Sequence, residues 1–497
     1  MKRLSEVQSI CPECEKPIKA YYTERDGKVF FEKKCEEHGE FRALISASAE
    51  DYLTWVKNPV INIPPKKAIT KGSGQDECPL HCGTCENHLQ TACCVLIDIT
   101  KRCNQHCPFC FARAEMDAAD SGEPTLKDME AKFDLLTELG EERPFNIQLS
   151  GGEPTVRDDL PQIIRLAKDK GFTYIQINSN GRRIAQEHGY AKALKDAGAS
   201  VIFMQFDGTT DEIYMQMRGE PLFAEKKKAI DNCRKAGLPV TLVPTVARNV
   251  NLDNIGSMME FLLENIAVVK GIHFQPVSFF GRHPDPEHEN RVTMFDVLHE
   301  IENQCQGFKY EDFSPIATGH TLCCFYSTYL KEKDGIKCMV SKAEREAGIS
   351  CCDTQQASCC CGETDPLEII KKDRDFVLNK WDLPEESEPE HEAESCCSCG
   401  ASETEQEGNC CGQPQTETCC CETAEDSCCC GQDSEEIMDL DQFLTYYKQN
   451  TFTVTGMAFQ DSSNLDAERL KRCRVQVLSE DNRLIPFCGY NSIYRKE

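Results

Sequence analysis

The sequence predicts an α/β protein whose parallel sheet curls into a full or partial barrel. Two observations predict this fold. Six short apolar runs follow one another between Val95 and Phe279: VLIDIT, FNIQLS, TYIQIN, SVIFMQF, PVTLVPTV and GIHFQPVSF. Amphipathic segments such as LPQIIRLAKDKG and YAKALKDAG separate them, and both of these end in a helix-terminating glycine. Continuous apolar runs are typical of parallel strands buried on both faces, and right-handed crossovers curl such a sheet. The alternative from the pattern alone is an open, doubly wound sheet.

The remaining segments are expected to flank this barrel. A Pro- and Gly-bearing stretch, NIPPKKAITKGSGQDE, is typical of a linker in front of it. The predicted parts are an N-terminal metal-binding domain (1–58), a linker with an auxiliary cluster segment (59–94), the barrel (95–300), a barrel extension with auxiliary cysteines (301–350), an acidic Cys-rich insert (351–435) and a C-terminal auxiliary cluster domain (436–497).

Composition separates the insert from the rest of the chain. The 497 residues include 34 cysteines and carry a net charge of −28. Seventeen acidic residues and no lysine or arginine lie between Asp382 and Glu436, so the remainder carries only about −11. Sixteen cysteines fall between 351 and 435, where too few apolar residues are present to offset the entropy of ordering. We therefore expect a disordered insert whose cysteines are suited to soft metals.

The same composition limits partners and location. A strongly negative chain is repelled by phosphate backbones, which argues against nucleic acid as a partner. No apolar segment approaches the roughly 18 residues of a membrane span, and the N-terminus, MKRLSEVQSICPEC, lacks the apolar core of a secretory signal. We expect a cytoplasmic protein without an integral membrane segment, for which peripheral membrane contact stays open. The segment GSMMEFLLENIAVV fits a core-facing helix better than a lipid-facing one.

A loop with three cysteines follows the first predicted strand. The stretch KRCNQHCPFCFAR contains Cys103, Cys107 and Cys110. Parallel barrels carry their functional residues on the loops after the strands. Three thiolates are one ligand fewer than a closed zinc site or an ordinary iron–sulfur cluster requires. A [4Fe–4S] cluster held by three cysteines leaves one iron open for a substrate or cofactor. A zinc site completed by His106 is the alternative.

The second predicted strand runs directly into Gly151, Gly152 and Glu153. Paired glycines allow backbone amides to approach a ligand closely, and Glu153 is suited to accept hydrogen bonds from a ligand ammonium group. Such a triplet alone is usually an ordinary turn. One repeat downstream of the cysteine loop, it predicts a binding loop.

The combination of CNQHCPFC and SGGEP resembles the radical S-adenosylmethionine (SAM) superfamily. The resemblance implies a partial (β/α)6 TIM-type barrel in which the three cysteines hold a [4Fe–4S] cluster. It implies that SAM binds the open iron through its amino and carboxylate groups, that Phe109 packs near the adenine, and that the GGE triplet holds the SAM amino group. Ser179 and Asn180 in INSNG, with Thr245 in VPTV, fit the SAM ribose and carboxylate, and turn formation is their alternative role. For Asp207 and Arg218 we expect surface or structural roles.

The resemblance also implies a reaction. An electron from the reduced cluster cleaves the SAM sulfonium, and the resulting 5′-deoxyadenosyl radical removes a hydrogen atom from the substrate. A low-potential donor such as ferredoxin or flavodoxin is the expected source of the electron.

The other cysteines outside the insert predict further metal sites. The spacing C-x2-C-x20-C-x2-H of Cys11, Cys14, Cys35 and His38 predicts one tetrahedral ion, zinc or rubredoxin-like iron, with a structural role ahead of electron relay. The predicted ligands of a second cluster are Cys78, Cys82, Cys85 and Cys94. The predicted ligands of a third are Cys323, Cys324, Cys473 and Cys488, with inert core thiols as the alternative. We assign the isolated Cys233 and Cys305 to packing.

A more specific resemblance extends over most of the chain outside 351–435. The N-terminal CPEC…CEEHGEF, CPLHCGTC before IDITKRCN, SGGEPTVRDDL and the closing IPFCGYN resemble archaeal tetraether lipid synthases and related radical SAM proteins described as pterin methylases. Members of this group carry several [4Fe–4S] clusters and a mononuclear iron. The resemblance implies carbon–carbon bond formation between lipid chains, with methyl transfer to a pterin-like heterocycle and peptide or cofactor maturation as alternatives. A non-enzymatic iron–sulfur or metal carrier is a different class, which has no need of an amine-binding SGGEP loop.

Overall fold

Six parallel strands form the centre of the structure, which is a computed structural model. It describes residues 1–66, 78–83, 85–114, 122–140, 145–284, 291–339 and 440–495. The chain divides into two compact units, Met1–Leu383 with Tyr447–Glu497 and Pro384–Tyr446. The elements below belong to the first unit, except that helix α12 (Leu440–Asn450) crosses the boundary. The predicted insert (351–435) lies outside the described residues, and the domain boundaries of the sequence analysis stay predictions.

The six strands follow the six predicted runs. They are β5 (Cys94–Thr100), β6 (Asn146–Gly151), β7 (Ile175–Ser179), β8 (Val201–Gln205), β9 (Val240–Val243) and β11 (Val269–Pro276), and the two-residue β10 (Thr245–Val246) pairs with β11. Their spatial order equals their chain order, and every neighbouring pair is parallel. A doubly wound sheet reverses its strand order at a switch point. Because no reversal occurs here, the crossovers stay on one side, and the partial (β/α)6 barrel is confirmed.

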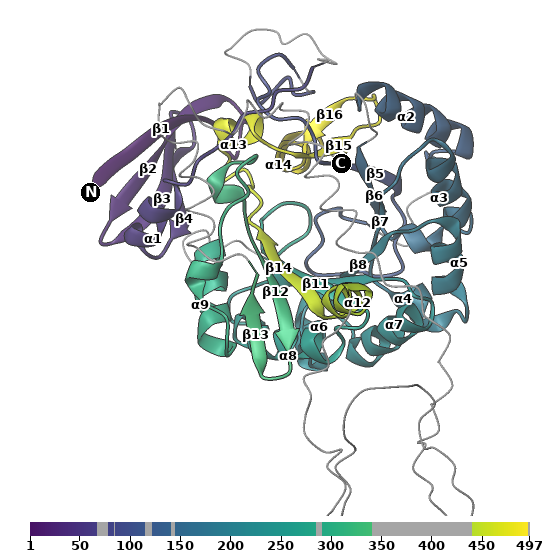
Figure 1. Cartoon of the computed structure of the whole chain (residues 1–497). Helices are drawn as coiled ribbons and strands as arrows, with labels where there is room; N and C mark the ends of the chain where they lie inside the picture. Colours follow the sequence, from purple (N-terminus) through teal and green to yellow (C-terminus); the bar gives the residue numbers. More distant parts are fainter. Residues whose placement is uncertain are drawn as a thin grey trace, which may run out of the picture. The chain divides into compact units, whose positions relative to one another are not determined.

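Helices cover the outer side of these strands (Figure 1). They are α2 (Leu126–Leu139), α3 (Leu160–Asp169), α4 (Arg182–Gln186), α5 (Tyr190–Ala197), α6 (Asp211–Arg218), α7 (Phe223–Lys235), α8 (Ile255–Glu264) and α9 (Met294–Gln304). Capping boxes begin two of them, at Thr125 with Asp128 for α2 and at Thr293 with Asp296 for α9. Helix α8 buries Met258, Met259 and other apolar residues, which confirms that GSMMEFLLENIAVV faces the core. None of the helices in the described part of the chain is long and apolar enough to cross a membrane.

The C-terminal tail adds strands at both edges of the barrel sheet. Strand β14 (Thr451–Met457) runs parallel to β11, and β12 (Cys324–Glu332) and β13 (Gly335–Cys338) continue that edge in antiparallel fashion. At the other edge β15 (Val475–Leu478) runs parallel to β5 and pairs with β16 (Leu484–Pro486). The short elements nearby are α13 (Ala467–Lys471), α14 (Phe487–Gly489), the 3-10 turns η1 (Pro154–Val156), η2 (Leu252–Asn254), η3 (Tyr310–Asp312) and η4 (Thr321–Cys323), and the π-helical η5 (Tyr490–Tyr494).

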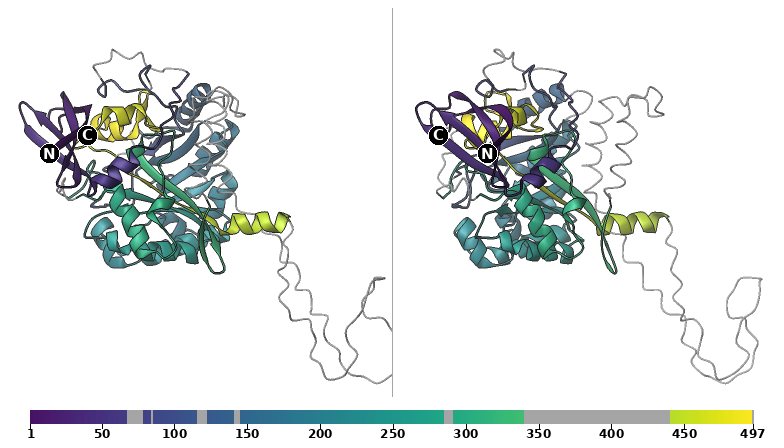
Figure 2. Two further views of the ribbon diagram at one scale, coloured as in Figure 1. Left: turned by 60° about the vertical axis from the view of Figure 1, so that its left-hand side comes forward. Right: turned by 90° about the vertical axis from the view of Figure 1, so that its left-hand side faces the viewer.

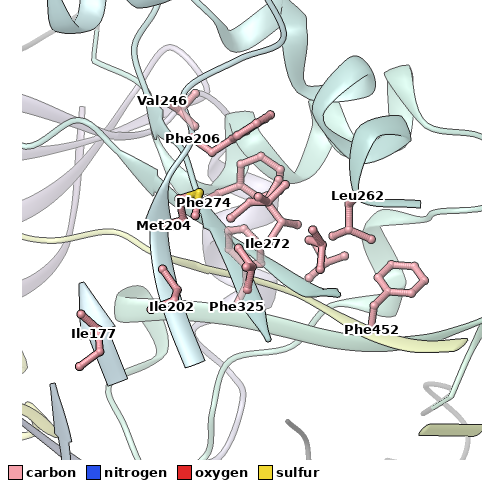
Figure 3. Close-up of a cluster of buried hydrophobic side chains, with 14 of the residues drawn as sticks. Ile177, Ile202, Met204, Phe206, Val246, Leu262, Ile272, Phe274, Phe325 and Phe452 are labelled. Carbon is pink, nitrogen blue, oxygen red and sulfur yellow. The ribbon is translucent and has the colours of Figure 1, made fainter. Parts of the chain in front are cut away.

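The two faces of the barrel sheet differ in chemistry. Successive strand residues point to opposite faces. One set of alternating positions is apolar and fully buried, and Figure 3 shows part of it, including Ile202, Met204, Ile272 and Phe274. The other set carries polar side chains that face a cavity. The sheet is therefore largely buried on both faces, as expected, and its inner face differs in carrying polar side chains because it lines a site.

The N-terminal residues form an antiparallel sheet in the order β1-β2-β3-β4. Its elements are β1 (Lys2–Ile10), β2 (Pro17–Arg25), β3 (Lys28–Cys35), β4 (Gly39–Ser46) and the following helix α1 (Ala49–Trp55). This sheet lies against the C-terminal α13 (Figure 2). Three buried side chains bond it there: Ser9 Oγ donates to Leu465 O (2.6 Å), Tyr22 Oη to Asp466 Oδ2 (2.8 Å), and Lys33 Nζ to Ser462 O (2.5 Å).

A buried lysine gives the barrel edge a pH dependence that we predict as follows. Lys270 Nζ on β11 donates to the carbonyls of Lys448 and Gln449, and burial lowers its pKa to about 8. Between pH 8 and 10.5 the unfolded chain binds a proton that the folded protein does not, so stability rises with pH. We expect the unfolding free energy to gain about 3 kcal/mol over this window, and Lys270→Met to lack that gain. Denaturant unfolding at several pH values measures it, and parallel curves for both proteins would contradict the expectation.

Candidate functional site

A cavity of about 420 Å³ opens on the inner face of the barrel. It lies at the ends of the strands and is also bounded by the tail residues Met457, Phe459 and Phe487. Its lining includes all ten residues that the sequence predicts around the cluster and SAM: Cys103, Cys107, Phe109, Cys110, Gly151, Gly152, Glu153, Ser179, Asn180 and Thr245. Residues from four different strand-end loops therefore meet in one place, as the barrel topology requires.

The cysteine loop is held in place by groups from distant elements. Cys103 and Cys107 are buried, and Cys110 is half-buried. Cys110 exchanges backbone hydrogen bonds of 2.8 Å with Arg282, whose Nη1 also donates to Cys107 O (3.0 Å). Asn180 Nδ2 donates to Asn104 Oδ1 (2.7 Å). The three thiols are thus arranged by the protein before any metal binds.

The two glycines of SGGEP permit the loops after β5 and β6 to touch. Gly152 N donates to Thr100 O and Glu153 N to Arg102 O, both at 2.8 Å. A Cβ atom at Gly152 would lie 2.0 Å from Arg102 O, and one at Gly151 would lie 2.1 Å from Thr100 O. The N–H groups of Gly152 and Glu153 therefore bond to the backbone that leads into the cysteine loop, and contact of the triplet with the SAM amino group remains a prediction.

Glu153 connects the loops after β6 and β7. Its Oε1 accepts from Thr155 Oγ1 (2.6 Å), Thr155 N (3.1 Å) and Ser179 Oγ (2.8 Å), and its Oε2 accepts from Asn180 N (2.6 Å). Burial raises the pKa of this carboxyl group, while the donors favour its charged form. A carboxylate has about four acceptor positions, so Oε2 retains capacity for a ligand ammonium group.

The later strand-end residues are used partly within the protein. Ser179 Oγ accepts from Gly181 N (3.0 Å) as well as donating to Glu153, which matches its turn alternative. Thr245 Oγ1 accepts from Arg218 Nη2 (3.2 Å). Both residues still line the cavity with Asn180, and contact of the three with the SAM ribose and carboxylate remains a proposal.

Asp207 and Arg218 form a buried, bidentate ion pair. Arg218 Nε and Nη2 each donate to Asp207 at 2.7 Å, and the Asp207 side chain is fully buried. Arg218 Nη1 also donates to Phe109 O (2.8 Å). Phe109 packs against a small apolar cluster that includes Met217 of α6 and Ala247. Of the two roles expected for this pair, the structural one is correct and the surface one is wrong. Arg218 also positions the cysteine loop through its hydrogen bond to Phe109.

Sequence reasoning missed a row of carboxamides across the inner face. Tyr174 Oη donates to Gln176 Oε1 (3.5 Å), Gln176 Nε2 to Asn178 Oδ1 (2.9 Å), and Asn178 Nδ2 to Gln148 Oε1 (3.4 Å). Asn146, Gln205 and Gln275 line the same cavity. The alternation N-I-Q-L-S and Q-I-N in β6 and β7 is the signal that identifies this row.

The N-terminal ligands come together as predicted. Their ligand atoms all lie within 4.8 Å of one another, with Cys14 Sγ 3.9 Å from Cys35 Sγ and His38 Nδ1 3.7 Å from Cys11 Sγ. Tetrahedral zinc with 2.3 Å bonds separates its sulfurs by roughly 3.8 Å. The hydrogen bond with His38 lowers the pKa of Cys35 to about 6, which favours a thiolate ligand. These residues therefore fit a single tetrahedral ion.

The three-cysteine loop does not have this compact geometry. Among the described residues, the N-terminal set is the one group of three or more His, Cys, Asp or Glu whose ligand atoms lie that close. This spacing favours a cluster over a zinc site that His106 completes. Burial raises the pKa of Cys103 to about 12, and it raises that of Cys107 too. Three wider-spaced thiols on a cavity wall fit a cluster, whose binding would displace their protons.

The auxiliary cysteines divide into smaller neighbourhoods. Cys78 and Cys82 share a hydrogen bond that lowers the pKa of Cys78 and raises that of Cys82, and the charge of Cys85 acts on Cys82 as well. Their C-x3-C-x2-C spacing repeats that of the catalytic loop, a signal that the sequence analysis did not use. Cys94, predicted to join them, instead lines the cavity beside Cys93.

The third predicted set is partly assembled. Burial raises the pKa of Cys473, and the neighbouring thiols of Cys488 and Cys323 raise it further. Cys324 begins β12. Burial raises the pKa of its thiol, and the neighbouring thiols of Cys323 and Cys93 add to this increase. Which cysteines share which cluster remains a proposal. Cys233 and Cys305 are buried within the main apolar core, which agrees with their packing role.

Comparison with known proteins identifies the class that the barrel and cysteine loop define. Residues 97–262 match the family described as Radical SAM superfamily, and residues 3–47 match the HMPTM N-terminal zinc ribbon domain. The chain is 33% identical to the 7,8-dihydro-6-hydroxymethylpterin dimethyltransferase of Methanocaldococcus jannaschii, over 98% of this chain and 94% of that protein. The chain therefore belongs to the radical SAM superfamily, and it is an enzyme of that class.

Two further likenesses are more limited. The Fe-coproporphyrin III synthase of Methanosarcina barkeri is 30% identical over 44% of this chain and 52% of that protein. The crystal structure of Streptococcus suis SuiB bound to S-adenosylmethionine has a TM-score of 0.34 and 14% identity, over 44% of this chain and 44% of that chain.

The loop contact at Gly152 predicts a sensitive position. Gly152→Ala places a methyl group against Arg102 O, and the loops must separate, which costs about 1–3 kcal/mol. We expect a lower melting temperature and loss of most of the iron that depends on Cys103, Cys107 and Cys110. Gly319→Ala is the matched control, because its nearest atom, Ile316 O, is 3.6 Å away. Iron analysis and thermal unfolding test this, and equal values for both variants would refute it.

The N-terminal site predicts a separable metal. Cys14→Ala removes one of four ligands, so we expect the purified protein to lose one metal equivalent per chain. The control Cys233→Ala removes a core thiol and should keep the full metal content. Elemental analysis after anaerobic purification measures both, and an unchanged content in Cys14→Ala would show that the ion is held elsewhere.

Proposed function

We propose that this radical SAM enzyme transfers methyl groups to a pterin-like heterocycle. The single observation that carries the proposal is the row of carboxamides that shares one cavity with the three cysteines. The name of the Methanocaldococcus jannaschii relative supports it, since that protein is described as a pterin dimethyltransferase.

Different residues bind the cofactors and position the cysteine loop. Cys103, Cys107 and Cys110 hold the [4Fe–4S] cluster, and Glu153 is placed to accept from the SAM amino group. When bound, the reduced cluster supplies the electron that splits SAM and yields the 5′-deoxyadenosyl radical. The protein contributes a largely apolar cavity wall that includes Phe111, Phe459 and Phe487 around the reactive species. Arg218 and Arg282 keep the cysteine loop in position during this step.

The carboxamides favour a polar, planar substrate. Each carboxamide offers one acceptor and two donor N–H groups, and a pterin ring edge offers both kinds of partner. Gln148, Gln176 and Asn178 are fixed by one another, so their remaining donors and acceptors are presented in a defined order. The cavity volume of about 420 Å³ lies within the roughly 300–1,000 Å³ range of small-molecule sites.

Lipid coupling is the second candidate, because part of the cavity is apolar. Phe487 lies 4.5 Å from Phe459, 5.7 Å from Phe111 and 6.1 Å from Phe280 between ring centroids, and all four rings line the cavity. A hydrocarbon would leave the remaining donors and acceptors of the carboxamides without partners, at about 1–3 kcal/mol for each buried group. This cost places heterocycle methylation ahead of carbon–carbon coupling between lipid chains, which was the leading expectation from the sequence.

The other parts of the proposal follow from the class. The substrate is a small molecule, and a low-potential donor such as ferredoxin or flavodoxin supplies electrons. One or two auxiliary [4Fe–4S] clusters and an N-terminal zinc or iron complete the cofactors. A cytoplasmic location remains a prediction from the sequence.

A mass-spectrometric assay tests the proposed reaction. The reconstituted enzyme would be reduced and incubated anaerobically with SAM and 7,8-dihydro-6-hydroxymethylpterin. We expect a pterin product heavier by one or two methyl groups, and methyl-deuterated SAM then shows whether the methyl group comes from SAM. A parallel incubation with archaeal diether lipids separates the candidates, because coupled lipid and unchanged pterin would overturn the proposal.

The carboxamide row predicts a substrate-specific defect. Asn178→Leu removes the link between Gln176 and Gln148, so we expect KM for the pterin to rise roughly tenfold, equal to about 1.4 kcal/mol. SAM cleavage without pterin should stay within twofold, since no cysteine ligand is touched. The exposed Gln186→Leu on α4 is the control. Equal KM values for Asn178→Leu and wild type would exclude this row from substrate recognition.

A further inference from the structure

A buried carboxamide lies inside the cysteine loop and is not explained by the roles above. Gln105 is 4% exposed and lines the cavity between Cys103 and Cys107. Its Oε1 lies 3.7 Å from Cys107 Sγ. The carboxamide of this residue is thus beside one of the three cysteine sulfurs.

The amide nitrogen of this side chain has no partner. Gln105 Nε2 is buried and makes no hydrogen bond with any part of the chain that the structure describes. Buried polar groups in native proteins are nearly always paired, so an orphan donor on a cavity wall indicates a missing acceptor. Gln148, which lines the same cavity, differs because its carboxamide accepts from Asn178 Nδ2.

We propose that Gln105 Nε2 donates a hydrogen bond to a sulfur atom of the loop-bound iron–sulfur cluster and thereby raises its reduction potential. The acceptor chemistry supports this assignment. Cysteine thiolates bound to iron, and inorganic sulfides, carry no proton and can only accept. As a thiol, Cys107 donates its S–H to Gln105 Oε1, 3.7 Å away. As a thiolate the same sulfur can only accept, and a half-turn of the carboxamide presents the donor Nε2 to it in place of Oε1.

The expected effect follows from charge. Reduction adds an electron to the cluster and increases the negative charge on its sulfurs, so an N–H donor stabilises the reduced state more than the oxidised one. Gln105 acts through the cluster and is therefore a positioning residue in this reaction. Its contribution would ease electron delivery from the physiological donor without contact with the methylated substrate.

The test measures the reduction potential of the cluster and not the activity of the enzyme. Gln105→Met keeps the side-chain length and removes the donor, while Gln105→Glu replaces the donor with an acceptor. The signal to follow in an EPR-monitored redox titration is the one absent from the Cys103→Ala/Cys107→Ala/Cys110→Ala protein, which separates it from auxiliary clusters. We expect midpoint potentials more negative than wild type in the order Met then Glu, with iron and sulfide contents unchanged. Gln186→Met, an exposed control, should match wild type.

Several outcomes would overturn the inference. Unchanged potentials in both variants, with full iron content, would show that Nε2 does not face the cluster. Weaker SAM binding with an unchanged potential would assign the donor to the SAM carboxylate. If Gln105→Met loses iron, the midpoint potential of Gln105→Glu is the test, and a value equal to wild type would overturn the inference. Loss of iron from both variants would show that Gln105 has a structural role and would overturn it too.

This inference rests on the proposed cluster and not on the proposed substrate. If no signal depends on the three cysteines, the cluster assignment itself fails. If the signal is present and pterin is not methylated, the substrate proposal fails while the Gln105 inference stands.

Discussion

The close contact between the loops after β5 and β6 is the constraint on which the site depends. Two glycines allow the backbone of SGGEP to lie against Thr100 and Arg102, at a separation that no side chain would permit. Two hydrogen bonds of 2.8 Å fix that contact. The position of the first cysteine, immediately after Arg102, is therefore set by the second strand as much as by its own.

From this contact, buried polar groups extend around the barrel. Glu153 connects the β6 loop to Ser179 and Asn180 after β7, and Asn180 returns to the cysteine loop at Asn104. The Asp207–Arg218 pair completes the ring at Phe109. The side chains of Glu153, Ser179, Asn180, Asp207 and Arg218 are buried and would be costly without their partners, so the loops are held as a set. The thiols thus gain a fixed arrangement from residues that do not bind metal.

Several features were predictable from the sequence and others were not, for physical reasons. The six strands, the N-terminal metal site and the meeting of ten residues in one cavity follow from local periodicity, ligand spacing and barrel topology. The polar inner face was missed because apolar residues dominate each run, although the alternation at Gln148, Gln176 and Asn178 is visible. The strands that the tail adds at both sheet edges depend on long-range pairing, which no local pattern carries. The grouping of auxiliary cysteines likewise depends on tertiary contacts, which sequence spacing does not reveal. Cys94 is an example, because it is close in sequence to Cys85 but lines the cavity.

The most direct measurement of the central claim is 5′-deoxyadenosine production by the reconstituted, dithionite-reduced protein in the presence of SAM. The three-cysteine site predicts product from the wild type and none from the protein with alanine at Cys103, Cys107 and Cys110. Equal product from both proteins, with the variant folded and its auxiliary iron retained, would contradict the assignment of these cysteines to the catalytic cluster.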